Sequence, residues 1–122
     1  MELNEYQIKA MSTCMVSCEN FSYMFLNLVG EVGEFASKIA KAIRKSDAEI
    51  IDNRLVAYTS KVPELNKELM MEAGDILWQI SSLCSIMGWE LEEIAQMNLD
   101  KLAARKAVGT IDGNGDGIIR SK

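Results

Sequence analysis

The chain has 122 residues, of which 13 are Lys or Arg, 18 are Asp or Glu and none is His, so its formal net charge is −5. This length fits one small domain that can bury a core. The negative charge argues against a non-specific grip on nucleic acid or on an anionic membrane, so a small anionic ligand would need a metal ion or local cations.

Helical periodicity dominates the chain. Apolar residues recur three and four apart, runs of β-branched residues are few, and there is one proline. We therefore expect an all-α fold, a bundle of four to five helices with no strand. The expected helices cover residues 3–18, 21–45, 47–57, 63–87 and 90–107, so that one domain spans 1–108 and a glycine-rich tail spans 109–122.

The first expected helix carries Cys14 and Cys18, four residues apart, and the third cysteine is Cys84. Such a pair is half of a metal site, but the chain has no histidine and no second cysteine pair to complete it. We interpret the cysteines as small buried apolar residues. Without a signal peptide, or an apolar run long enough to span a membrane, the chain is expected to be cytoplasmic.

The second expected helix, 21–45, carries an apolar stripe and a second apolar flank, and the helix 63–87 has the same character. Each should be covered on two sides. Two such helices in so short a chain predict that a second copy supplies part of the cover, in a homodimer or a homotetramer.

An acidic motif, Glu31-x-x-Glu34, lies on the second expected helix, where residues three apart project from one face. Taken alone, this motif is typical of a solvated face, because Lys38 follows Glu34 by four residues and can pair with it. Ser46 and Asp47 can cap a short third helix. Residues 46–62 are weakly amphipathic and could cover a site, join an interface or move, and the sequence does not decide among these roles.

The helix 63–87 gives a stronger signal, because one narrow strip of it is acidic and contains no lysine or arginine. Uncompensated like charge on one helix face is destabilising, so a cation should meet this strip. The strip consists of Glu64, Glu68, Glu72, Asp75 and Gln79.

Clustered carboxylates on two facing helices are ligands for one or two Mg²⁺ or Mn²⁺ ions. Gly30, Gly33 and Gly74 lie beside the acids and could let the two backbones approach closely. The expected metal ligands are Glu31, Glu34, Glu72 and Asp75.

The last expected helix presents Asn98, Lys101 and Arg105 along one edge, which a solvated amphipathic helix would also do. In the tail, residues 112–119 match the first eight positions of a calcium loop. The chain ends before the position of the bidentate glutamate, so we do not expect a calcium site there.

LVGEVGE followed by EAGDILW resembles the MazG-type nucleotide pyrophosphohydrolases, and MNLDKLAAR resembles the Asn-x-x-Lys segment of that family. The resemblance covers most of the chain and excludes about 46–62. It implies an all-α enzyme that uses Mg²⁺ or Mn²⁺ to cleave a nucleoside triphosphate between its α and β phosphates. The products would be a nucleoside monophosphate and pyrophosphate.

In such a site the four acids would hold the metal ions, and Glu34 or Glu72 would act in catalysis. The resemblance assigns the triphosphate to Asn98 and Lys101, with Arg105 on the same edge. Lys38 is a candidate phosphate ligand, and Asn27, which shares the face of Glu31, is a candidate for the base. The alternative is a non-catalytic module that binds metal-nucleotide or docks a partner through the same acidic groove.

Overall fold

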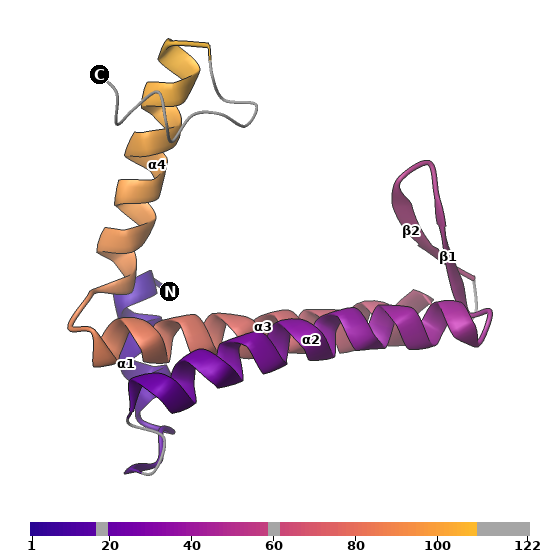
Figure 1. Cartoon of the computed structure of the whole chain (residues 1–122), viewed down its shortest axis with the longest axis horizontal. Coiled ribbons are helices and arrows are strands. Elements are labelled where there is room, and N and C mark those ends of the chain that lie inside the picture. Colours follow the sequence, from indigo (N-terminus) through magenta and orange to yellow (C-terminus); the bar gives the residue numbers. More distant parts are fainter. Residues whose placement is uncertain (17–19, 59–61, 110–122) are drawn as a thin grey trace.

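The computed structural model describes residues 1–16, 20–58 and 62–109. Two long helices, α2 (Phe21–Arg44) and α3 (Val62–Ile86), lie side by side and form the long axis of the molecule (Figure 1). At one end α1 (Leu3–Met11) packs against α3, and α4 (Leu91–Ala107) rises from the same end. At the other end stands a hairpin of β1 (Ala48–Ile51) and β2 (Arg54–Ala57). The all-α class is thus confirmed, with a small sheet that was not expected.

The two ends of α2 follow from local hydrogen bonds. Asn20 precedes the helix, and its side-chain oxygen accepts a bond of 2.7 Å from the backbone N–H of Tyr23. At the other end the N–H of Asp47 donates to the carbonyl of Ala42 at 2.8 Å, and Ser46 takes a φ of 63°. This left-handed residue closes the helix and directs the chain into the hairpin.

The expected helix over 47–57 is wrong, because this segment is the β1–β2 hairpin. The strands pair antiparallel from Ala48 opposite Ala57 to Ile51 opposite Arg54. Asp52 and Asn53 connect them with φ values of 50° and 62°, as the two-residue type I′ turn requires. Asp and Asn tolerate this conformation better than most residues, and β-branched side chains in the flanking segments favour strands.

The first helix is shorter than the expected 3–18, because α1 ends at Met11. The hydroxyl of Ser12 donates to the carbonyl of Lys9 at 2.6 Å, and that of Thr13 donates to the carbonyl of Ala10 at 2.7 Å. These side chains satisfy carbonyls at the helix end and so compete with its continuation. Cys14 is half-buried and Cys84 is a buried free thiol, whereas Cys18 lies outside the described residues.

Gln7 joins α1 to the turn between α3 and α4. Its amide nitrogen donates at 2.9 Å both to the hydroxyl of Ser85 and to the carbonyl of Trp89, and its amide oxygen accepts a bond of 2.8 Å from the N–H of Leu91. Gly88, with a φ of 74°, ends α3 as expected. Gln7 therefore fixes the direction in which α4 leaves the body.

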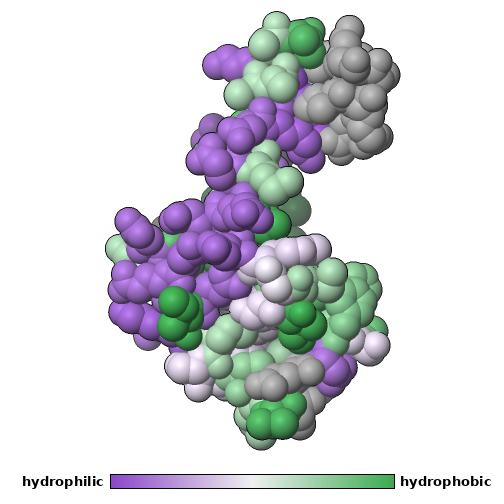
Figure 2. All heavy atoms as spheres, turned by 90° about the vertical axis from the view of Figure 1, so that its left-hand side faces the viewer, coloured by the Kyte–Doolittle hydropathy of each residue, from purple (hydrophilic) through white to green (hydrophobic). Residues whose placement is uncertain are grey.

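The buried core is small, and much apolar surface is exposed. At the hairpin end Ala42, Ala48 and Leu65 pack together, with Leu69 against them. Figure 2 views the end from which α4 rises, where hydrophilic residues follow α4 and hydrophobic residues gather on the lower part of the body. Among the described helices, none is long and apolar enough to cross a membrane.

Candidate metal centre

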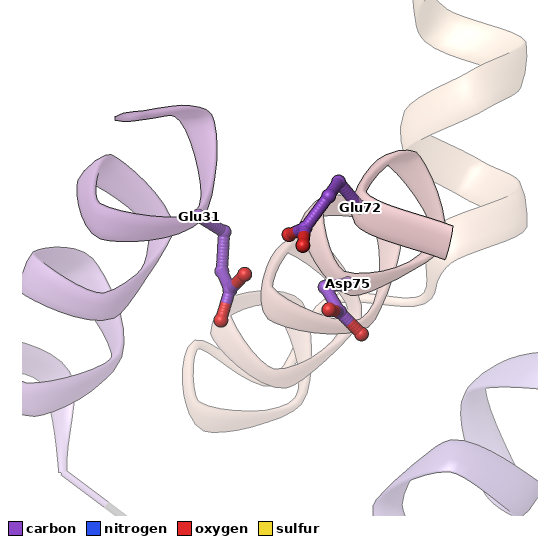
Figure 3. Close-up of side chains that lie close together, drawn as sticks. All are labelled: Glu31, Glu72 and Asp75. Atoms are coloured by element: carbon purple, nitrogen blue, oxygen red, sulfur yellow. The ribbon is translucent and has the colours of Figure 1, made fainter. Parts of the chain in front are cut away.

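Three carboxylates from α2 and α3 meet near the middle of the helix pair. Glu31 reaches from α2 towards Glu72 of α3, and Asp75 lies one turn further along α3 (Figure 3). One ligand oxygen from each residue can be chosen so that the three lie within 4.8 Å of one another. Glu31 and Glu72 are half-buried, and Asp75 is exposed. The structure thus brings together three of the four expected metal ligands.

The electrostatics of this cluster favour a bound cation. Burial raises the pKa of Glu31 above its usual value, and the charges of Asp75, Glu72 and Glu34 raise it further. Tyr6 of α1 also has a raised pKa, first because of burial and then because of the charge of Asp75. Both shifts record negative charge gathered in a partly buried place, which a divalent cation would offset.

The residues present also fit a magnesium ion by their chemistry. Among the described residues, no lysine or arginine forms an ion pair within 4 Å of these three carboxylates. Gln79 follows Asp75 by one turn, is only 6% exposed, and its amide oxygen has no hydrogen-bond partner within the described residues. Carboxylate and amide oxygens, together with waters, are the ligands that Mg²⁺ prefers.

Glu34 is the expected ligand that stands apart. It is exposed, lies one turn beyond Glu31 on α2, and does not belong to the group of three close oxygens. Its charge still contributes to the raised pKa of Glu31. Within the described residues Lys38 forms no ion pair with Glu34, so the intrahelical pair that the spacing allowed is absent.

The expected close approach of the backbones at glycines is wrong. A Cβ atom added at Gly30, Gly33 or Gly74 would meet no atom within 4 Å. All three glycines are exposed, so the facing surfaces of α2 and α3 do not depend on them. The acids instead meet because their side chains are long enough to bridge the two helices.

Trp78 and Tyr6 link α1 to the part of α3 that carries Asp75. Trp78 of α3 donates from its indole N–H to the carbonyl of Ala10 at 3.1 Å and to the hydroxyl of Thr13 at 3.0 Å. These bonds hold α1 beside Asp75, where Tyr6 lies within reach of its charge. Asn27, the candidate base ligand, is half-buried and lies one turn before Glu31.

The candidate triphosphate ligands on α4 do not join this cluster within one chain. Asn98 is exposed, and Lys101 and Arg105 are half-buried, all on a helix that points away from the α2–α3 pair (Figure 1). Any role for these residues in the same site requires that α4 of another copy approaches it.

Comparisons with known proteins found one family and one similar protein. The profile of the MazG nucleotide pyrophosphohydrolase domain matches residues 19–109, a range that contains the three carboxylates and the whole of α4. The Gene 37 protein of Mycobacterium phage L5 is 34% identical over 123 residues, which cover 95% of this chain and 98% of that protein. No solved structure gives a significant match.

Proposed function

Because the chain belongs to the MazG nucleotide pyrophosphohydrolase family, we propose that it hydrolyses a nucleoside triphosphate between the α and β phosphates with Mg²⁺ as the metal and Mn²⁺ as a possible substitute. The observation that carries this proposal is the cluster of Glu31, Glu72 and Asp75, whose oxygens lie within 4.8 Å of one another. The metal ion that accompanies the nucleotide would supply the positive charge that this cluster lacks.

In this proposal Glu31, Glu72 and Asp75 hold the metal through their carboxylate oxygens. A bound Mg²⁺ supplies Lewis-acid chemistry, since it polarises phosphate oxygens and acidifies a coordinated water. Glu34, one turn from Glu31 and outside the group of close oxygens, is the carboxylate that can accept a proton from the attacking water. Asn27, one turn before Glu31 on α2, would contact the nucleoside.

We further propose that the working unit is a homodimer or a homotetramer. Phe25, Val29 and Val32 of α2 are 48%, 58% and 51% exposed, and they lie about 100–160° around the helix from Glu31. Met70 and Leu77 of α3 are also exposed. This apolar face points away from the acids, and covering it with a second copy would complete a four-helix bundle.

Assembly would also give α4 a role. Asn98, Lys101 and Arg105 lie away from the acids of their own chain, so we propose that they contact the triphosphate bound to another copy. The buried free thiol of Cys84 suits a cytoplasmic location, where thiols stay reduced.

The test of this function is pyrophosphate release from a panel of canonical and modified nucleoside triphosphates, with and without Mg²⁺. Glu72→Gln is assayed beside the wild type, and Glu93→Gln, an exposed acid on α4, is the matched control. We expect metal-dependent release that Glu72→Gln reduces by about 10³-fold or more, and that the control leaves within about twofold. If the folded wild-type protein releases no pyrophosphate from any nucleotide, the binding-module alternative replaces this proposal.

A further inference from the structure

A hollow of about 250 Å³ opens between α2 and α3 on the hairpin side of the acidic cluster. Ala42 and Leu65 contribute to the buried floor of the hollow, since they are only 8% and 7% exposed. The short side chain of Ala42 leaves room above this floor. The remaining lining consists of charged side chains of both signs. They are Lys38, Lys41 and Lys45 of α2, Asp47 of the following turn, and Glu64 and Glu68 of α3.

These charges face one hollow without pairing. Within the described residues, none of the three lysines forms an ion pair within 4 Å. The lysines recur three and four residues apart, a spacing at which like charges destabilise a helix. Lys41 and Lys45 lie near the C-terminus of α2, where a positive charge stabilises the helix. That stabilisation does not explain why the lysines line a hollow.

The hollow adjoins the acidic cluster along the same groove. Glu68 lines the hollow and precedes Glu72 by four residues, which is about 6 Å along the helix axis. Glu64 and Leu65 belong to the first turn of α3, whose N–H groups favour an anion. On the other side of the cluster lie Tyr6, whose pKa is raised by burial and by the charge of Asp75, and Trp78, which donates a hydrogen bond to Thr13.

We propose that this hollow holds the pyrophosphate half of the nucleoside triphosphate and then the released product, as its magnesium complex. The hollow is smaller than the roughly 300–1,000 Å³ typical of pockets for organic ligands, so it suits an inorganic group better than a nucleoside. Its lysines would contact phosphate oxygens, and its carboxylates would contact waters of the metal ion. The triphosphate would therefore run from the cluster towards the hairpin, with the nucleoside towards α1.

This inference rests on the proposed function. It adds the direction in which the triphosphate lies along the groove and a site for the leaving group. Attack by water forms a bond from the water oxygen to the α-phosphorus, and the bond from that phosphorus to the bridging oxygen of the β-phosphate breaks. The bridging oxygen leaves with the electron pair as part of pyrophosphate. Ammonium groups at that position would stabilise the charge that develops on the leaving group.

The test is calorimetric binding of inorganic pyrophosphate to the full chain with and without Mg²⁺. The variant is Lys41→Gln with Lys45→Gln, the charge-preserving control is Lys41→Arg with Lys45→Arg, and the distant control is Lys9→Gln on α1. We expect the glutamine variant to bind magnesium pyrophosphate about tenfold or more weakly, which corresponds to about 1.4 kcal/mol. Both controls should stay within about twofold, and binding of a nucleoside monophosphate should not change.

Equal pyrophosphate binding by the wild type and the folded glutamine variant would overturn the proposal, because the metal cluster and the residues proposed on α4 would then hold the phosphates without these lysines. Equal weakening of nucleoside monophosphate binding would also overturn it, since the lysines would then not contact the pyrophosphate half specifically. These outcomes are independent of turnover. If the wild type hydrolyses nucleotides but the lysines do not affect pyrophosphate binding, only this inference fails. If pyrophosphate binding depends on the lysines but no nucleotide is hydrolysed, only the proposed function fails.

Discussion

Removing one carboxylate from the acidic cluster should make the metal-free protein more stable, which is the reverse of what most substitutions at an interhelical contact do. Glu72→Gln keeps the size of the side chain and removes one charge. The oxygens of Glu31, Glu72 and Asp75 lie within 4.8 Å of one another. At that separation two unit charges repel by about 0.9 kcal/mol in bulk water and by about 3.5 kcal/mol at an effective dielectric constant of 20.

The half-buried and exposed positions of these acids favour the lower end of this range. We therefore expect Glu72→Gln to raise the free energy of unfolding by about 1 kcal/mol in the presence of EDTA. Mg²⁺ should reverse which of the two proteins is the more stable. At ten times its dissociation constant it stabilises the wild type by about 1.4 kcal/mol, whereas a variant that no longer binds it gains nothing.

The assay is denaturant unfolding of both proteins at one protein concentration, in EDTA and across a Mg²⁺ titration. Glu93→Gln on α4 controls for the loss of one negative charge far from the cluster, and it should respond to Mg²⁺ as the wild type does. If Glu72→Gln is less stable than the wild type in EDTA, and Mg²⁺ stabilises both equally, the three acids are not a strained metal centre and the reasoning fails.

Three further results are expected. Gln7→Leu should cost about 2–4 kcal/mol of unfolding free energy, because it removes three hydrogen bonds and leaves the N–H of Leu91 buried without its partner; a loss below about 0.5 kcal/mol would contradict the role given to Gln7. In EDTA, unfolding free energy should fall as pH rises above 4.5, the usual pKa of a glutamate, because the raised pKa of Glu31 means that the folded chain binds this proton more tightly than the unfolded chain; an equal slope in Glu31→Gln would count against this assignment. Asn53→Gly should add about 0.5 kcal/mol, since its φ is 62° in the type I′ turn, and destabilisation would argue against that turn.

The sequence predicted the helices best where a local signal fixed each end. The apolar stripe of α2 placed it within one residue of its observed bounds, and Gly88 marked the end of α3. The hairpin was missed because its ten residues are also weakly amphipathic. The signal for a two-residue turn was Asp52-Asn53, between segments that contain the β-branched residues Ile51 and Val56. Helical periodicity on both sides of the hairpin outweighed this signal.

For the site, spacing predicted which acids share a face but not which of them meet. Glu31, Glu72 and Asp75 converge, while Glu34 stays exposed, because the crossing of α2 and α3 decides which turn of one helix faces which turn of the other. The direction of α4 depends on Gln7, 84 residues before Leu91 in sequence. Bonds between such distant residues leave no periodic pattern, so the separation of Asn98 and Lys101 from the acids could not be predicted.

We expect folding and the proposed association to be coupled, because few large apolar side chains are buried within one copy. The buried apolar side chains among the described residues include three alanines, Ala10, Ala42 and Ala48, whereas larger side chains such as Val29 remain exposed. Burying one large apolar side chain contributes about 1.5–3 kcal/mol, so a second copy that covers the exposed apolar face would add to the stability of the fold. The melting temperature of the wild type should therefore rise with protein concentration.

Val29→Glu places a charge on the exposed apolar face and tests this coupling directly. It should shift the protein towards the monomer in light scattering, and its melting temperature should fall below that of the wild type at every concentration, because a buried unpaired charge is costly. Ser37→Glu, on an exposed position of the same helix away from that face, should keep the assembly. If Val29→Glu assembles and melts as the wild type does, another surface covers the apolar face or none does. The second copy proposed for the site would then have to approach from the side of the acids.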